Sequence, residues 1–454
     1  MRNIKKKIFL VVFVAFLMTF ITPVQGGNPF RKETSTTSGY STWDSDMINI
    51  EAVTQTGDGV YIAVLDTGLA PNWRDYFPDE RIASELGTGF YEELKWNPAI
   101  GDFEETTGKL HTTSFVGSRG TTHGTHVTST IIGYFYDANY DEISGWDIGP
   151  IMVRGIAPEV TIIPVKVLAD YQVPANPKAE PDPTPAETVV FGTDRMVAAG
   201  IQYIADLAPS LDGPVIISMS LGGPTPDTLS ETAIDNAIDN GVIVVASAGN
   251  EGTDGMGWPG AYPQVISVGA SGWTEEWLQE IGGELWFDRM WWLQHPSVWD
   301  HDIAEPTPVD QVYVADFSSR EIPNHPYGVQ ELDVLAPGSW VRGPYPGTPG
   351  YSHLPWWSEG IGDLAGWNPG NFYYVGGTSM AAPHVSAVAA LILDKDSSIE
   401  QSEMETLLED NALPIPAGFR IIYNPNVGFI SQAWGDDATG AGLIQAEAAL
   451  AAIP

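Results

Sequence analysis

The most informative stretch of the chain is GGTSMAAPHV, residues 376–385. Its two glycines allow a sharp backbone turn, the hydroxyl of Ser379 follows, and the small apolar residues 380–393 predict a buried helix. A serine at such a junction has its own N–H among the unpaired donors of the helix start, and that donor can stabilise an oxyanion while the side chain attacks. An N-cap serine on a core helix is the alternative, and this stretch alone does not separate the two.

Asp66 follows a predicted buried strand. Residues 60–65, VYIAVL, are apolar and rich in β-branched side chains, and Asp66 begins the sequence DTG. Because α/β sheets place their functional sites at the carboxyl ends of strands, Asp66 is a candidate site residue. A turn aspartate is the alternative interpretation.

A histidine stands at a glycine-rich helix start. The segment HGTHV, residues 123–127, begins an apolar run that extends to Tyr134. His123 is therefore well placed to act as a general base. For the neighbouring His126 we expect the ordinary role of a hydrogen-bonded structural histidine. The chain order Asp66, His123, Ser379 differs from the triad orders of chymotrypsin and the α/β-hydrolases.

Five motifs in this order resemble the subtilisin-like serine proteases. They are VLDTG (64–68), HGTHV (123–127), SMSLGG (218–223), ASAGN (246–250) and GGTSMAAPHV (376–385), and the resemblance extends from about residue 43 to about residue 450. It implies a serine endopeptidase that forms an acyl-enzyme with the triad Asp66, His123 and Ser379. The side chain of Asn250 would be the second oxyanion donor, beside the Ser379 N–H.

The resemblance also implies where a substrate would bind. In this family the segment Ser220, Leu221, Gly222, Gly223 and the residues before Asn250, here Ala248 and Gly249, form the walls of the pocket for the residue preceding the cut bond. Gly257 corresponds to the base of that pocket. Because glycine leaves this base open, we expect broad specificity with a preference for large apolar residues before the cut.

Alternating apolar strands and helices predict an α/β fold. We expect a doubly wound, mostly parallel central sheet with helices on both faces, as in subtilisin, within one peptidase domain over residues 43–454. Long insertions are expected near 75–108, 170–186, 272–314 and 339–371. The first is expected to be irregular and the second an exposed loop. The third is rich in tryptophan, and we expect these side chains to form a small core of the insertion's own, with a substrate wall as the alternative.

Metal ligands are suggested by acidic residues. Asp75 lies nine residues after Asp66, which matches a carboxylate that binds calcium in many relatives. The loop containing Asp137, Asn139 and Asp141 has oxygen ligands at alternate positions, as calcium prefers, but an acidic surface loop explains it equally well. No cofactor is expected for catalysis.

The amino-terminal segment predicts export. Basic residues precede the apolar run 8–21 and small residues follow, so residues 1–26 are expected to be a signal peptide and 27–42 a short polar leader. The run is shorter than the roughly 20 residues that span a bilayer, although a membrane tether by the uncleaved segment is the alternative. Family members often carry an inhibitory prosegment here, and we expect too little room for one.

Composition limits the possible partners. The chain has 454 residues, of which 43% are hydrophobic, no cysteine and a net charge of −38. Such a charge argues against binding nucleic acid through its phosphates, and polypeptide substrates of a monomeric secreted enzyme are expected instead. Two other functions remain as alternatives: a catalytically silent peptide-binding scaffold, and a serine esterase of another fold.

Overall fold

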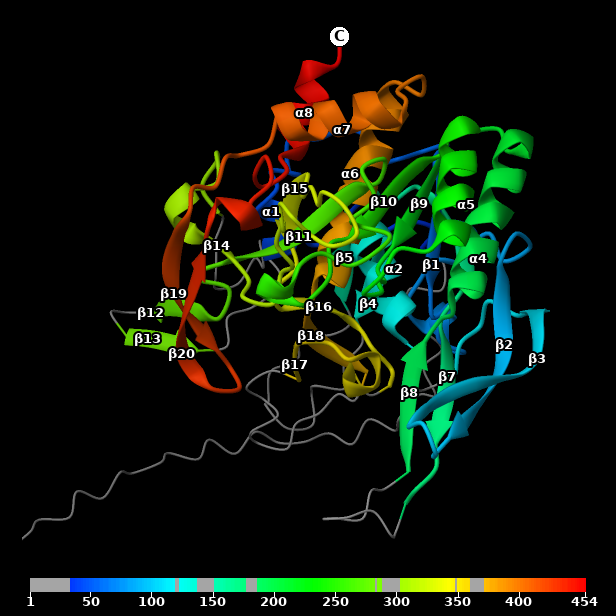
Figure 1. Ribbon diagram of the computed structural model, residues 1–454. Helices are drawn as coiled ribbons and strands as arrows, with labels where there is room; N and C mark the ends of the chain where they lie inside the picture. Colours follow the sequence, from blue (N-terminus) through cyan, green and yellow to red (C-terminus); the bar gives the residue numbers. More distant parts are fainter. Residues whose placement is uncertain are drawn as a thin grey trace, which may run out of the picture.

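The computed structural model describes residues 33–118, 122–136, 151–176, 186–281, 284–287, 303–347, 349–359 and 371–454. A nine-stranded sheet lies at its centre (Figure 1). The strands of this sheet are β1 (Tyr61–Asp66), β2 (Thr88–Asn97), β3 (Asp102–Thr113), β6 (Thr161–Lys166), β9 (Val215–Met219), β10 (Ile243–Ser247), β11 (Ile266–Trp273), β14 (Val312–Val314) and β15 (Val334–Pro337).

The sheet is mostly parallel. Its order is β14-β11-β10-β9-β1-β6-β2-β3, with β15 also paired to β11. The strands from β11 to β2 and also β15 run parallel, whereas the outer strands β14 and β3 are antiparallel to their neighbours. Strands β9 and β10 are fully buried, which explains their continuous apolar sequences, because a parallel sheet is covered on both faces.

Helices cover both faces of the sheet. Helices α2 (His123–Ile132) and α6 (Thr378–Lys395) pack against each other, and α4 (Asp194–Leu207) and α5 (Thr228–Asp239) form a second pair (Figure 1). The other α-helices of the described residues are α1 (Trp43–Asp46), α7 (Gln401–Asp410) and α8 (Ala446–Ala452). The expected doubly wound α/β fold is confirmed.

Small antiparallel sheets surround this centre. They are formed by β4 (Gly133–Tyr136) with β5 (Ile151–Arg154), β7 (Ala169–Val173) with β8 (Glu187–Phe191), β12 (Leu278–Ile281) with β13 (Glu284–Phe287), β16 (Val341–Pro344) with β18 (Phe372–Gly376) and β17 (Trp356–Ser358), and β19 (Gly418–Asn424) with β20 (Gly428–Trp434). All of these pairings are antiparallel.

Two segments that we expected to lack regular structure contain strands. The insertion 75–108 is not irregular, because β2 and the first part of β3 form a hairpin that joins the sheet through β6. The segment 170–186 is not simply an exposed loop, because β7 within it pairs with β8. The two hairpins pack against each other around a second, smaller core. Its members are Phe90, Tyr91, Leu94, Phe103, Leu110, Ala169, Tyr171, Val189, Phe191 and Met196.

The tryptophans of the insertion 272–314 are only partly as expected. Trp273 and Trp277 are 2% and 1% exposed and belong to the main core, so the interpretation of a separate small core is wrong for these two. The ring of Trp277 lies 5.5 Å from that of Trp340 and 4.5 Å from that of Tyr374. Trp291, Trp292 and Trp299 lie outside the described residues, as do the expected signal peptide and the loop with Asp137, Asn139 and Asp141.

The length and apolar character of the described helices bear on whether they could cross a membrane. Among the described residues, none of the helices combines the length and the apolar character that crossing a bilayer requires.

Candidate active site

Asp66 lies at the point in the central sheet where the order of the strands reverses. Strand β1 is the first strand of the sheet in the chain and lies between β6 and β9, so the later strands are added on both of its sides. Asp66 is the last residue of β1 and is fully buried. Such a switch point, at the carboxyl end of a parallel strand, is where open α/β sheets form their binding crevices.

His123 contacts the carboxylate of Asp66 directly. Its Nδ1 lies 2.9 Å from both Asp66 oxygens, and the residue is 4% exposed. The N–H of Thr67 donates to Asp66 Oδ1 at 2.6 Å and holds the carboxylate in place. Because a carboxylate accepts a hydrogen bond, this contact places the proton on Nδ1 and leaves Nε2 as the basic nitrogen.

A glycine permits this close approach. A Cβ on Gly124 would lie 2.6 Å from the carbonyl oxygen of Gly68 and 3.1 Å from Asp66 Oδ1. The N–H of Gly124 also donates to the hydroxyl of Thr67 at 2.9 Å. The glycine after His123 therefore lets the first turn of α2 dock onto the end of β1.

Ser379 is the second residue of α6 and is 8% exposed. Its hydroxyl donates to the backbone oxygen of Ser220 at 3.3 Å, and the Ser220 hydroxyl donates to the backbone oxygen of Ser379 at 2.7 Å. Among the described residues no hydrogen bond joins Ser379 to His123. The structure thus brings Asp66 and His123 into contact and holds Ser379 against the segment that follows β9.

Asn250 is anchored beside the start of α6. Its Oδ1 accepts from the N–H of Thr378 at 2.9 Å and from the Thr378 hydroxyl at 3.0 Å. Because a backbone N–H only donates, these contacts fix which end of the amide is oxygen. The Asn250 amide nitrogen lies on the side of Gly377, 3.7 Å from a Cβ placed on that glycine. The NH₂ group and the Ser379 N–H are therefore two donors at the same helix terminus.

The glycines of the expected substrate pocket lie together. Gly223 and Trp258 exchange two backbone hydrogen bonds of 2.8 and 2.9 Å, and the N–H of Gly257 donates to Ala248 O at 2.8 Å. A Cβ on Gly257 would lie 3.3 Å from Gly223 O and 3.9 Å from Ala248 O, whereas a Cβ on Gly223 would meet no atom within 4 Å. Gly257 thus lies between the two wall segments, and Gly223 borders open space.

His126 has the structural role we expected. It is fully buried, and its Nε2 lies 3.1 Å from the backbone oxygen of Val341. Burial lowers the pKa of His126 to about 3, with a smaller contribution from the nearby His123. The ring therefore stays neutral at ordinary pH.

The sequence did not indicate which insertion residues border the site. Strand β17 pairs with β18 so that Trp356 lies opposite Gly376. A Cβ on Gly377 would lie 3.5 Å from the Leu354 side chain and 3.7 Å from Pro355. The insertion 339–371 therefore supplies side chains directly beside the turn before Ser379, and its Trp and Pro content was the only sequence signal.

A buried glutamate also lies beneath this turn. Glu276 accepts from the hydroxyls of Tyr313 at 2.5 Å and Ser339 at 3.2 Å. Ser339 follows Gly338, whose carbonyl accepts from the N–H of Gly377 at 2.8 Å. Burial raises the pKa of Glu276 to about 8, against the opposing effect of these hydrogen bonds.

The expected calcium ligand Asp75 lies on the surface. It is exposed in a short 3₁₀ turn, Trp73–Asp75, and accepts from Asn72 Nδ2 at 3.1 Å. It belongs to neither of the two groups of three acidic side chains that could hold a cation in the described part of the chain.

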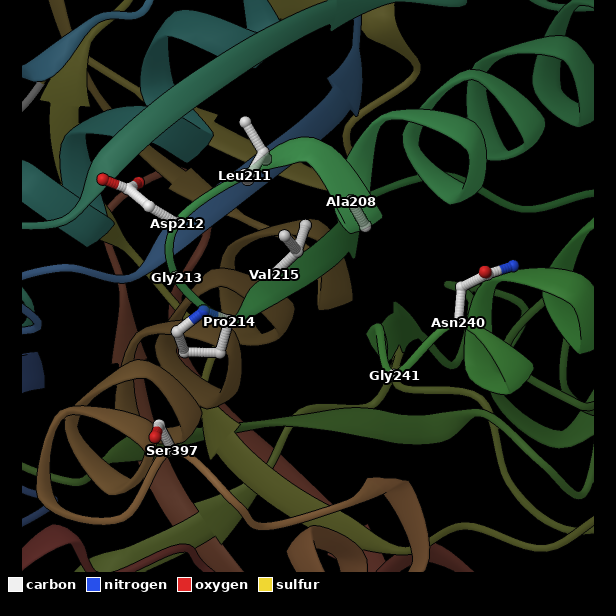
Figure 2. Close-up of a pocket in the computed structure, with 9 residues that line it drawn as sticks. All are labelled: Ala208, Leu211, Asp212, Gly213, Pro214, Val215, Asn240, Gly241 and Ser397. Atoms are coloured by element: carbon white, nitrogen blue, oxygen red, sulfur yellow. The ribbon is translucent and has the colours of Figure 1, made fainter.

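Figure 2 shows a surface hollow that is lined by none of these residues. It has a volume of about 370 Å³ and lies at the opposite end of the sheet, where β9 begins at Val215. Its one carboxylate, Asp212, accepts from the hydroxyl of Tyr61 at 2.7 Å. Apart from Asp212 and the hydroxyl of Ser397, its lining is apolar, backbone or amide, with no histidine and no cluster of charges, so its size does not make it an active site.

Known proteins resemble the chain over most of its length. The model of the subtilase family matches residues 57–443. Subtilisin E of Bacillus subtilis strain 168 is 28% identical over 361 residues, which are 79% of this chain and 61% of subtilisin E. The chain therefore spans less than two thirds of that relative. The subtilisin of Bacillus pumilus is 28% identical over 368 residues, which are 80% of this chain and 87% of the relative.

Two solved structures are similar in fold. Sphericase superimposes with a TM-score of 0.50 and 25% identity, covering 90% of this chain and 99% of sphericase. The S41 psychrophilic protease gives a TM-score of 0.51 and 22% identity, with the same coverage of 90% and 99%.

Proposed function

The chain belongs to the subtilase family of serine-type endopeptidases, and from that premise we propose that it hydrolyses polypeptides with the triad Asp66, His123 and Ser379. The observation that carries this proposal is the contact of His123 Nδ1 with both Asp66 oxygens at 2.9 Å, at the end of the central strand. This contact gives His123 the tautomer that a base for Ser379 needs.

The chemistry follows from these groups. A serine hydroxyl is a weak nucleophile at neutral pH and needs a base. His123 Nε2 takes the Ser379 proton as Oγ attacks the peptide carbonyl, and His123 then gives this proton to the leaving amine. Asp66 stabilises the imidazolium formed in between. Water then attacks the resulting acyl-enzyme by the same sequence, which releases the second product and restores the serine.

In apo enzymes a hydrogen bond between nucleophile and base is often long or absent and tightens only with substrate. The present bond from Ser379 to the Ser220 carbonyl is 3.3 Å long, which is longer than the usual about 2.7–2.8 Å of an O–H···O hydrogen bond. A rotation of the Ser379 side chain toward His123 upon substrate binding is part of the proposal.

The developing oxyanion would be held by Asn250 and the Ser379 N–H. Support comes from the two hydrogen bonds that Thr378 donates to Asn250 Oδ1. They fix the orientation of the amide, so its NH₂ group does not have to reorient when the oxyanion forms.

We further propose that the residue before the cut bond enters the space bounded by Ser220, Leu221, Gly222 and Gly223 on one side and by Ala248 and Gly249 on the other, with Gly257 at its base. The lack of side chains at the glycines leaves room for Phe, Tyr, Leu or Met.

Export is also a proposal. It rests on the basic, apolar and small residues of 1–26. Asp75, together with Asp137, Asn139 and Asp141, remains our proposal for calcium, which would stabilise the fold and take no part in catalysis.

A peptide anilide assay tests the function. The full chain should hydrolyse a substrate with Phe before the anilide, and phenylmethylsulfonyl fluoride should block the reaction. Ser379→Ala should lose nearly all of this activity while its Tm stays close to that of the parent. His123→Ala combined with Ser379→Ala should be no worse than either change alone, because the two residues act as a unit.

The alternatives give other results. A silent scaffold would bind peptides without cleaving the anilide. An esterase would cleave esters but not anilides. Anilide hydrolysis that persists in Ser379→Ala would refute the assignment of the nucleophile.

A further inference from the structure

The segment after the tryptophan-rich insertion docks onto the beginning of the domain. The N–H of Ile303 donates to Asp46 Oδ2 at 2.7 Å, and the hydroxyl of Thr307 donates to Met47 O at 2.9 Å. Ile303 and Thr307 are each 2% exposed. Residues separated by more than 250 positions in the chain are thus joined in a buried contact. Glu305 lies between Ile303 and Thr307 in the sequence.

Three carboxylates meet at this contact. Asp46, Glu51 and Glu305 each have one oxygen within 4.8 Å of the others. Asp46 is buried, Glu51 half-buried and Glu305 exposed, so the group has one closed side and one side toward solvent. Like charges at such distances repel, and the repulsion grows as water is excluded.

Glu51 gives the second and independent observation. Both of its carboxylate oxygens are buried, and neither has a hydrogen-bond partner among the described residues. Arg154 is close enough to interact electrostatically, but no ion pair joins it to Glu51 in the described part of the chain. Burying carboxylate oxygens without partners costs free energy, and a bound cation would compensate this cost.

The other acidic group of the described residues differs in this respect. It consists of Asp333, Glu405 and Glu409. Its most buried member, Asp333, accepts from the N–H of Ser267 at 2.6 Å and from the Ser267 hydroxyl at 2.9 Å. Among the described residues, no oxygen of this group is both buried and without a hydrogen-bond partner, in contrast to Glu51.

We propose that Asp46, Glu51 and Glu305 bind a divalent cation, with calcium the best fit. Calcium takes oxygen ligands at about 2.3–2.6 Å, so two oxygens on one ion lie at most about 5 Å apart, as these three do. The open side leaves room for water ligands. Magnesium demands stricter octahedral geometry, and zinc prefers the nitrogen and sulfur ligands that this group lacks.

The consequence would be a cross-link. The ion would join the segment 46–51 to residue 305, and so fix the end of the insertion 272–314 to the start of the domain. This site is separate from Asp75 and from the triad, and its existence does not depend on the proposed activity.

Calcium titration of the full chain tests the proposal. All samples carry Ser379→Ala, so that proteolysis cannot contribute, and are stripped of metal with a chelator. In isothermal titration with CaCl₂, Glu51→Gln should bind one ion fewer than the parent, or bind that ion with a Kd at least about tenfold higher. The reason is that the number of charged ligands sets the affinity of a calcium site. Glu305→Gln should weaken the same ion less. Glu447→Gln, an exposed change of equal charge on α8, should have no effect.

Thermal unfolding distinguishes a ligand from a purely structural residue. Without calcium, Glu51→Gln should raise Tm, because it removes repulsion from a buried carboxylate. With millimolar calcium, the variant should lack part of the Tm gain that the parent shows. A variant with the parent's stoichiometry and Kd would overturn the proposal, and so would an equal Tm change with and without calcium.

Discussion

Replacing Glu276 by glutamine should change how stability depends on pH. In the unfolded chain a glutamate titrates near 4.5, whereas burial raises the pKa of Glu276 in the folded protein to about 8. Between these values the folded state holds a proton that the unfolded state releases. The free energy of unfolding therefore falls as pH rises through this range, and the loss is complete above about pH 8.

The structure also bounds the size of the effect. One pKa unit corresponds to about 1.4 kcal/mol, so the difference between 4.5 and about 8 sets an upper limit of about 5 kcal/mol. Relaxation and water entry reduce such penalties, and we expect about 1–3 kcal/mol to be observed. Glutamine keeps an oxygen for the hydroxyls of Tyr313 and Ser339 and cannot ionise.

The assay compares Glu276→Gln with its parent, both carrying Ser379→Ala, by guanidinium unfolding at pH 5 and pH 9 with calcium held constant. The difference in free energy of unfolding between variant and parent should change by about 1–3 kcal/mol in favour of the variant from pH 5 to pH 9. Glu447→Gln serves as a control and should show no such gain. If the free energies of unfolding of variant and parent differ by the same amount at pH 5 and at pH 9, Glu276 is ionised in the folded protein and the reasoning is wrong.

Three further changes test the site and its surroundings. Asn250→Ala should lower kcat by about 10²–10³ with little change in KM, and unaltered kcat would show that Asn250 is not an oxyanion donor. Gly257→Val should reduce kcat/KM for substrates with Phe before the cut far more than for those with Ala, because its side chain would fill the pocket next to Gly223 O; equal losses for both would contradict this. Asp75→Asn should reduce the Tm gained with millimolar calcium. If NaCl of matched ionic strength gives the parent the same gain as calcium, the Asp75 site is wrong and only screening of the acidic surface remains.

The parallel sheet was predictable because its strands are buried on both faces. The strand predicted from residues 60–65 is β1, Tyr61–Asp66, and the helix predicted from residues 380–393 lies within α6, Thr378–Lys395. The hairpin of β2 and β3 was missed because only one of its faces is apolar. That face packs against β7 and β8, which are remote in the chain, so the local sequence appears acidic and irregular.

The site was predictable in its residue types and not in its contacts. Asp66, His123 and Ser379 could be predicted from the motifs, because each lies in a short stretch with a glycine close to it at the end of a strand or the start of a helix. The hydrogen bond from Ser379 to Ser220 and the position of Leu354 beside Gly377 depend on packing between segments that are distant in the chain. Glu276 had no local signal at all, because its raised pKa comes from burial in contact with residues that are distant in the chain, such as Tyr313 and Ser339.

The outer strand β3 affects how the molecules behave toward one another. It ends the central sheet, and an edge strand with unpaired backbone groups can pair with the edge of another molecule. Along β3 the side chains of Asp102, Glu104 and Glu105 are exposed. Two copies approaching edge to edge would bring these carboxylates together, and the repulsion between them would oppose growth of the sheet into an aggregate.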